Sequence, residues 1–513
     1  MVVRLPCENQ PSSRVQSPQR DVRTAAWVLT ATILGSAMPA IDGTAVNVAL
    51  PILQREMHAG SQAIQWVFEG YSLFLSALIL VGGSLGDHVG RRRMFLLGVV
   101  VFAAASLGCA IAQTIDQLIA ARCIQGIGGA LLVPESLALI TASFDERHLG
   151  GAIGTWSGFL AAAMALGPLL GGWLAQAVSW RLVFVINLPI ALVVFAVTLR
   201  YAGESRDEQI AGRIDWLGAA IATAALGLLT YGCISLQGAR IDELGLAAVL
   251  AGLALLGVFV YVEHRSTAPM IPLGIFASTG FTVANVYTLL LYAGLGGALF
   301  FVPFNLINVQ HYTPVGAGAA LLPMIVLMFV SSRWSGGLVA RTGARVPLAL
   351  GALAAGFGFA LFGFTGIGGS YWSTFFPAVI LLGIGTSTFV APLTTTVMSS
   401  APSAHAGSAS GINNAVSRVA GLIAVALFGI LIVVSSHNAL LASDRGLPRT
   451  VRTVLEADSL LSGRAPSAGI PQPLRGQAGR AVNEAYEIGF RNAMLASAAL
   501  AWLAAALAWV VKT

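Results

Sequence analysis

Apolar runs of about 20 residues, the length that an α-helix needs to cross a bilayer, recur along nearly the whole chain. Backbone polar groups in lipid must be satisfied within the segment, so such runs predict membrane-spanning helices. Charged residues make up 10% of the 513 positions, whereas soluble domains contain roughly a quarter. We therefore predict an all-α polytopic membrane protein embedded in a lipid bilayer.

The boundaries of the apolar runs give fourteen predicted transmembrane spans. They lie at residues 26–48, 62–84, 94–113, 117–140, 151–177, 182–200, 214–235, 244–262, 280–303, 315–339, 346–366, 373–397, 408–435 and 490–511. Residues 1–24 are polar and lack an apolar core, which favours a cytoplasmic N-terminal tail over a signal peptide.

Arginines in the short loops orient the chain, because basic residues concentrate on the cytoplasmic side. The clusters Arg91–Arg93 and Arg200–Arg213 follow the second and sixth spans. We expect a multi-pass protein of the plasma (inner) membrane with both termini in the cytoplasm. The predicted outer loop 436–489 carries six Arg, which is at odds with the rule, although long loops obey it less strictly. Basic residues placed between apolar runs also argue against a nucleic-acid partner.

An internal repeat relates two loops of the chain. Residues 83–98 align with residues 336–351, with matching glycines at Gly90 and Gly343 and matching arginines at Arg92 and Arg345. Duplicated halves are common in transporters that move about a central site. Chance similarity between glycine-rich loops is the alternative.

Among the charged residues inside predicted spans, four stand out: Asp42, Glu69, Arg122 and Arg418. A charge at the centre of a membrane helix costs at least about 2.5–3.5 kcal/mol, so each needs a partner or water. Polar residues continue the same helical faces at Gln65, Gln125 and Asn414. These stripes predict a shared aqueous path; a buried structural ion pair of Arg122 with Asp42 or Glu69 is the alternative.

The fifth span is rich in glycine and contains a proline. Small residues four apart allow close helix packing, and proline bends a helix. The residues concerned are Gly154, Gly158, Gly167, Pro168, Gly171 and Gly172.

Four segments in this order resemble the fourteen-span drug:proton antiporter branch of the major facilitator superfamily, a branch of multidrug efflux transporters. They are Ala40–Pro51 in span 1, Gly83–Arg93 after span 2, Arg122–Gly129 in span 4 and Gly154–Gly172 in span 5. The resemblance implies a six-helix bundle at 25–200, a linker with two extra helices at 201–279 and a second six-helix bundle at 280–511.

The resemblance also implies roles for individual residues. Asp87, Arg91 and Arg92 would form a cytoplasmic charge cluster with Asp145 or Glu146, Arg122 would take part in proton exchange with the acids, and the span 5 residues would form a hinge or seal. Glu69 occurs in only part of the family, so its role in proton coupling is inferred from its place in span 2. The second loop copy departs from the first, with Ala340 where the first has Asp87. Glu135 is an extra acid expected near the cytoplasmic rim.

We therefore expect a monomeric exporter of amphipathic small molecules such as drugs, antibiotics or toxic metabolites, driven by proton antiport through alternating access. No enzyme activity, cofactor or metal site is expected, and the proton gradient is the energy source. Candidate cavity residues are Gln65, Gln125, Asn414, Arg418, Tyr287 and Tyr292. The alternatives are an exporter dedicated to one natural product or siderophore, and a proton-coupled importer of a small metabolite.

Overall fold

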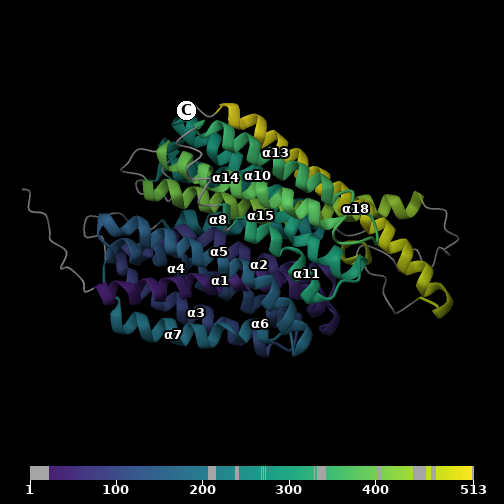
Figure 1. Ribbon diagram of the computed structural model, residues 1–513, viewed down its shortest axis with the longest axis horizontal. Helices are drawn as coiled ribbons and strands as arrows, with labels where there is room; N and C mark the ends of the chain where they lie inside the picture. Colours follow the sequence, from purple (N-terminus) through teal and green to yellow (C-terminus); the bar gives the residue numbers. More distant parts are fainter. Residues whose placement is uncertain are drawn as a thin grey trace, which may run out of the picture.

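The structure of the protein is a computed structural model. It describes every residue except 1–21, 206–214, 237–241, 267–268, 270, 272, 329, 332–341, 401–405, 443–457, 464–469 and 511–513. The described residues form helices and no β-strand, and most helices run along a common direction (Figure 1). The expected all-α polytopic class is confirmed.

The helices fall into an N-terminal group, an inserted pair and a C-terminal group. The N-terminal group comprises α1 (Val22–Glu56), α2 (Ser61–Val89), α3 (Arg91–Ile111), α4 (Ile115–Ser143), α5 (Glu146–Ala177), α6 (Leu182–Val185) and α7 (Asn187–Tyr201). The inserted pair is α8 (Trp216–Ser235) and α9 (Glu243–Arg265). The C-terminal group comprises α10 (Thr279–Phe304), α11 (Pro314–Ala320), α13 (Arg345–Phe362), α14 (Phe375–Ser399), α15 (Ala406–Ala442), α17 (Asp458–Ser462) and α18 (Arg475–Leu507).

Thirteen described segments are long and apolar enough to cross a bilayer. They coincide with thirteen of the fourteen predicted spans. The tenth predicted span, 315–339, is described as a shorter apolar helix over Pro314–Met328, and most of its second half lies outside the described residues. The span positions therefore follow the hydropathy pattern closely.

The two groups repeat one packing pattern. In the N-terminal group α1 packs on α5 and α7, and α3 packs on α4. In the C-terminal group α10 packs on α15 and α18, and α13 packs on α14. Figure 1 shows the first group, in purple and blue, lying beside the second, in green and yellow. This repetition is the arrangement expected from a duplicated bundle.

The aligned loop glycines share an unusual backbone conformation. Gly90 has φ 122° and Gly343 has φ 72°, both in the region that favours glycine. The matched glycines are therefore required by backbone geometry in both copies. The other aligned positions 336–341, including Ala340, lie outside the described residues.

The inserted helices extend the contact between the two groups. Helix α8 packs against α9, and it also contacts α2 of the first group and α15 of the second. Trp66 and Leu73 of α2 pack with Leu226 and Cys233 of α8 in two apolar clusters that also contain residues of α15. Helix α8 therefore covers one side of the α2–α15 junction.

The predicted loop 436–489 is partly helical, and this corrects its description as a loop. Helix α15 continues to Ala442, α17 is a short helix, and α18 begins at Arg475 rather than at residue 490. Leu440, Leu460 and Val482 form a small apolar core among these helices. The hydropathy pattern missed the first part of α18 because that helix is amphipathic there and contains several charged residues.

Candidate functional site

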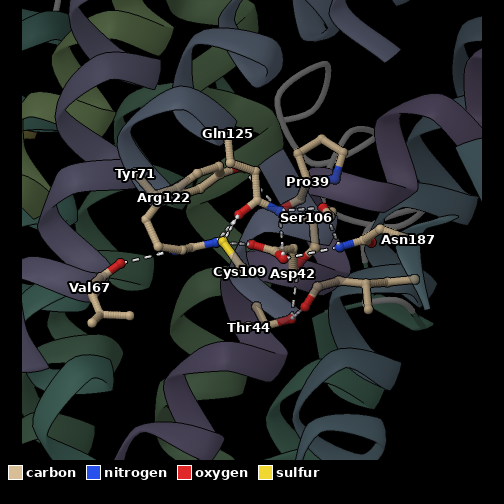
Figure 2. Close-up of polar contacts among 12 residues, drawn as sticks. Pro39, Asp42, Thr44, Val67, Tyr71, Ser106, Cys109, Arg122, Gln125 and Asn187 are labelled. Atoms are coloured by element: carbon tan, nitrogen blue, oxygen red, sulfur yellow. Dashed lines mark hydrogen bonds and ion pairs between the residues drawn. The ribbon is translucent and has the colours of Figure 1, made fainter. Parts of the chain in front are cut away.

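An ion pair between Asp42 of α1 and Arg122 of α4 lies at the centre of the N-terminal group (Figure 2). Neither side chain is exposed. Both charges sit inside membrane-length helices, where an unpaired charge is costly, so the pairing explains how the helices tolerate them. Arg122 thus forms the buried ion pair that was the alternative to a shared aqueous path, and its partner is Asp42 rather than Glu69.

Two amides complete the hydrogen bonding of Asp42. Its Oδ1 accepts from Nε2 of Gln125 at 3.0 Å and from Nδ2 of Asn187 at 3.1 Å. Both amides also reach the hydroxyl of Ser106 on α3, at 2.8 and 3.3 Å. The carboxylate of Asp42 thus has three donors from two helices. Figure 2 shows these groups converging on it.

Arg122 is also tied to α2. Its Nε donates to the carbonyl of Val67 at 3.0 Å, and its guanidinium carbon lies 4.3 Å from the ring centroid of Tyr71. A cation over an aromatic face is stabilised further when it is shielded from water. The side chain of Arg122 therefore joins α4 to α1 and α2 together.

Asn187 and Ser106 were not predicted as site residues. Asn187 is the first residue of α7, just after a break at Ile186 that divides the sixth span into α6 and α7. The available signal was a polar amide inside an otherwise apolar run. Its partner could not be inferred, because the contact joins residues far apart in the sequence.

Glu69 lies outside this network. It is fully buried, and neither carboxyl oxygen has a hydrogen-bond partner among the described residues. Its neighbours Trp66 and Leu73, three and four residues away, pack toward α8 and α15. Val67, which bonds to Arg122, is on a different face of α2. The polar stripe of α2 therefore does not join the polar stripe of α4 in this structure.

Charged residues gather where α2 meets α3. Nε and Nη2 of Arg91 donate to Oδ1 of Asp87 at 3.0 and 2.9 Å. Glu204, just beyond α7, accepts from the backbone N–H of Arg92 at 3.1 Å and pairs with Arg93 at 3.5 Å. Glu204 was not predicted; a lone acid after the sixth span gave no sign of its partners.

A second acid borders this cluster. Glu135 of α4 is buried, and its carboxyl group lies against Gly86, one residue from Asp87. Asp145, the acid implied for this role, is the N-cap of α5, where its Oδ1 accepts from the backbone N–H of His148 at 3.0 Å. The side chain of Glu146 lies outside the described residues.

The glycines of span 5 form close contacts with both groups. A Cβ on Gly171 would lie 2.6 Å from Cα of Ala45 on α1, and one on Gly172 would lie 2.7 Å from the carbonyl carbon of Pro314 on α11. Pro168 lies against Gly318 of α11 in the same way. These positions must stay small for α5 to fit between α1 and α11.

Two further contacts join the N-terminal and C-terminal groups near the contacts of α5 with α11. Nδ2 of Asn47 on α1 donates to the carbonyl of Leu299 on α10 at 2.9 Å. The rings of Phe68 on α2 and Phe300 on α10 have centroids 5.0 Å apart. We call this set of α1, α2 and α5 contacts with α10 and α11 the gate contacts. By the predicted orientation they lie toward the extracytoplasmic side.

The remaining cavity candidates differ in their surroundings. Tyr287 is fully buried and donates to the carbonyl of Leu348 at 2.7 Å, which is packing within the C-terminal group. Tyr292 packs against the same core. Gln65 is buried with both amide atoms unpartnered within the described chain. Asn414 is exposed.

Arg418 of α15 is half-buried and forms no ion pair within the described part of the chain. It lies near enough to Tyr71 of α2 to interact with it electrostatically. Tyr71 thus lies between Arg122 of the first group and Arg418 of the second.

Comparisons with known proteins agree with this architecture. The family model of the Major Facilitator Superfamily matches residues 32–425. The tetracenomycin C resistance and export protein of Streptomyces glaucescens is 32% identical over 98% of this chain and 94% of its own. The multidrug resistance protein Stp of Mycobacterium tuberculosis is 33% identical over 87% of this chain and 83% of its own.

A solved structure shares the fold. A bacterial homologue of the human lysosomal transporter Spinster, in an inward-facing and unoccupied conformation, matches with a TM-score of 0.68 over 96% of this chain and 97% of its own, at 16% identity. The fold and the buried network define a polytopic membrane transporter rather than an enzyme. The chain belongs to the major facilitator superfamily.

Proposed function

We propose that this transporter exports amphipathic small molecules in exchange for protons, by alternating access across the plasma (inner) membrane. The observation that carries the proposal is the fully buried Asp42–Arg122 pair, because a charge placed in a membrane-spanning helix marks an ion or proton pathway more often than a structural need. The proton acceptor is one of two acids buried in α1 and α2, Asp42 or Glu69.

The gate contacts support alternating access. Two packed groups with one repeated pattern can rock against each other about the contacts between them. In this conformation α5 and α1 are held against α11 and α10 at one end. The Asp87–Arg91 pair and the Glu204 contacts lie within the N-terminal group, near the opposite ends of the helices, where we propose that they help to set the balance between the two conformations.

The relatives guide the choice of substrate. Proteins named for resistance to tetracenomycin C, methylenomycin A and lincomycin are each about a third identical to this chain. We propose an antibiotic or other amphipathic metabolite as substrate and Arg418, the half-buried cation of α15, as a contact for it. We further propose that the protein acts as a monomer with both termini in the cytoplasm.

Export of one dedicated natural product is the second candidate. It is favoured by the match to the tetracenomycin C exporter, which covers nearly all of both chains. A substrate panel separates the two candidates: cells expressing the protein are scored for resistance to structurally unrelated compounds and for loss of efflux on adding a protonophore. Resistance to one chemical class supports dedicated export, and efflux that persists with the protonophore contradicts proton antiport.

A further inference from the structure

Two buried acids of the N-terminal group, Asp42 of α1 and Glu69 of α2, have opposite surroundings. Asp42 accepts hydrogen bonds from Arg122, Gln125 and Asn187. Glu69 is equally inaccessible, yet both of its carboxyl oxygens lack a donor among the described residues. Hydrogen-bond donors stabilise a carboxylate at Asp42, whereas no described residue donates a hydrogen bond to Glu69.

The inserted helix forms part of the enclosure of Glu69. Trp66 and Leu73 flank Glu69 on α2 and pack with Cys233 and Leu226 of α8. Cys233 is within electrostatic reach of Glu69. Helix α15 closes the same side with Leu422 and Ala426. Glu69 therefore points into an apolar junction of three helices.

None of the charged or titratable groups around α2 provides a counter-charge paired with Glu69 in the described structure. Helix α8 contributes Cys233. Helix α4 contributes Cys123, which lies against Gly70, and Arg122, which lies over Tyr71 and pairs with Asp42 of α1. Helix α15 contributes Arg418, which also faces Tyr71. Each of these two arginines interacts with Tyr71, and neither forms an ion pair with Glu69 in the described structure.

An ionised carboxylate in this junction would lack both water and a counter-charge, which costs several kcal/mol. A neutral carboxylic acid avoids most of that cost. We propose that Glu69, rather than Asp42, carries the exchanged proton in this conformation, and that α8 shields it from lipid and water. This inference rests on the proposed antiport function and assigns its proton site.

The step is a simple acid dissociation. When the contacts of α2 with α15 and α8 loosen and water enters, the O–H bond of the Glu69 carboxylic acid breaks and the proton passes to water. The resulting carboxylate is then stabilised by water, or by Arg418 if α15 shifts along α2. Asp42 stays paired with Arg122 in this conformation. The inserted pair thus has a role beyond joining the two bundles.

The proton on Glu69 can be tested chemically in the full-length protein. Dicyclohexylcarbodiimide forms a stable adduct with protonated carboxyl groups in apolar surroundings, and peptide mass spectrometry locates the adduct. We expect modification at Glu69 in membrane vesicles, its loss in Glu69→Gln and its retention in Asp42→Asn. An adduct at Asp42 with none at Glu69 would overturn the assignment.

A transport assay in reconstituted vesicles separates coupling from folding. Glu69→Gln should keep substrate exchange between equal pools, which needs no net proton movement, while gradient-driven transport falls by about tenfold or more. Glu69→Asp keeps the carboxyl group and should retain part of the gradient-driven transport. If a pH gradient drives transport by Glu69→Gln as strongly as by the wild type, the assignment of the proton to Glu69 is wrong, but the proposed antiport is not contradicted. If the wild type is not driven by a pH gradient, the proposed function itself fails.

Discussion

The guanidinium of Arg122 lies over the ring of Tyr71, with its central carbon 4.3 Å from the ring centroid, while the same group pairs with Asp42. Three helices of the N-terminal group therefore meet at one cation. In water each contact would be weak, but in a site without water they define how α1, α2 and α4 fit together.

Replacing Asp42 with Asn should destabilise the protein and abolish transport. The change leaves the buried guanidinium of Arg122 without a counter-charge, and breaking a buried ion pair on one side costs about 3–5 kcal/mol. The thermal unfolding of purified protein and gradient-driven transport measure the two effects.

A double substitution provides the control for Asp42. In Asp42→Asn with Arg122→Met no unpaired charge remains, so stability should recover relative to the single variant while transport stays lost. If the double variant is less stable than Asp42→Asn by the full cost of Arg122→Met alone, the two side chains are not coupled.

Alanine at Gly171 should disrupt the gate contacts. Its Cβ would lie 2.6 Å from the Cα of Ala45, and backbone atoms of α1 cannot yield locally, so α5 must move. Overpacking of this kind costs about 1–3 kcal/mol. We expect slow transport and increased labelling of an engineered cysteine at Asn47 by a membrane-impermeant reagent.

Gly154 provides a matched control on the same helix, because a Cβ there would meet no described atom within 4 Å beyond its chain neighbours and the backbone of its own helix. Gly154→Ala should keep transport and gain helix stability of up to about 1 kcal/mol. Equal loss of transport in both variants would mean that helix flexibility, rather than close contact, is what α5 requires.

Asp87→Asn should slow transport with little effect on stability. The Asp87 and Arg91 side chains are 30% and 23% exposed, and ion pairs of this kind contribute about 0–1 kcal/mol. The expected change is in the balance between conformations, seen as a lower turnover at an unchanged melting temperature. A large fall in the melting temperature would instead assign the pair a structural role.

Arg418→Gln tests the proposed substrate contact. Because Arg418 has no ion pair in the described structure, its removal leaves no unpaired acid and should not reduce stability. We expect KM to rise by about tenfold, as for loss of one charged hydrogen bond. An unchanged KM with lower stability would show that Arg418 supports packing only.

The helix positions could be predicted from the sequence because every span must be apolar over the thickness of the bilayer. The amphipathic first half of α18 could not, because no uninterrupted apolar run marks it. The interruption at Ile186 also escaped prediction, since a short break within an apolar run leaves hydropathy unchanged.

The site was predicted in part. Asp42, Arg122 and Gln125 could be singled out because polar groups in lipid need partners. Their mutual pairing and the roles of Asn187 and Ser106 depend on contacts between distant segments, which a single sequence does not encode visibly. The separation of Glu69 from this network likewise depends on how α2 is rotated, since α4 and α8 lie on different faces of it.

The most direct test of proton antiport uses purified protein in sealed vesicles loaded with a fluorescent substrate of the panel. A pH gradient is imposed by dilution, and substrate movement is followed with and without a protonophore. The account predicts that substrate moves in the direction opposite to the protons. This movement should stop when the protonophore dissipates the gradient, and it should be absent with Asp42→Asn. Substrate movement at the same rate without any pH gradient would contradict it.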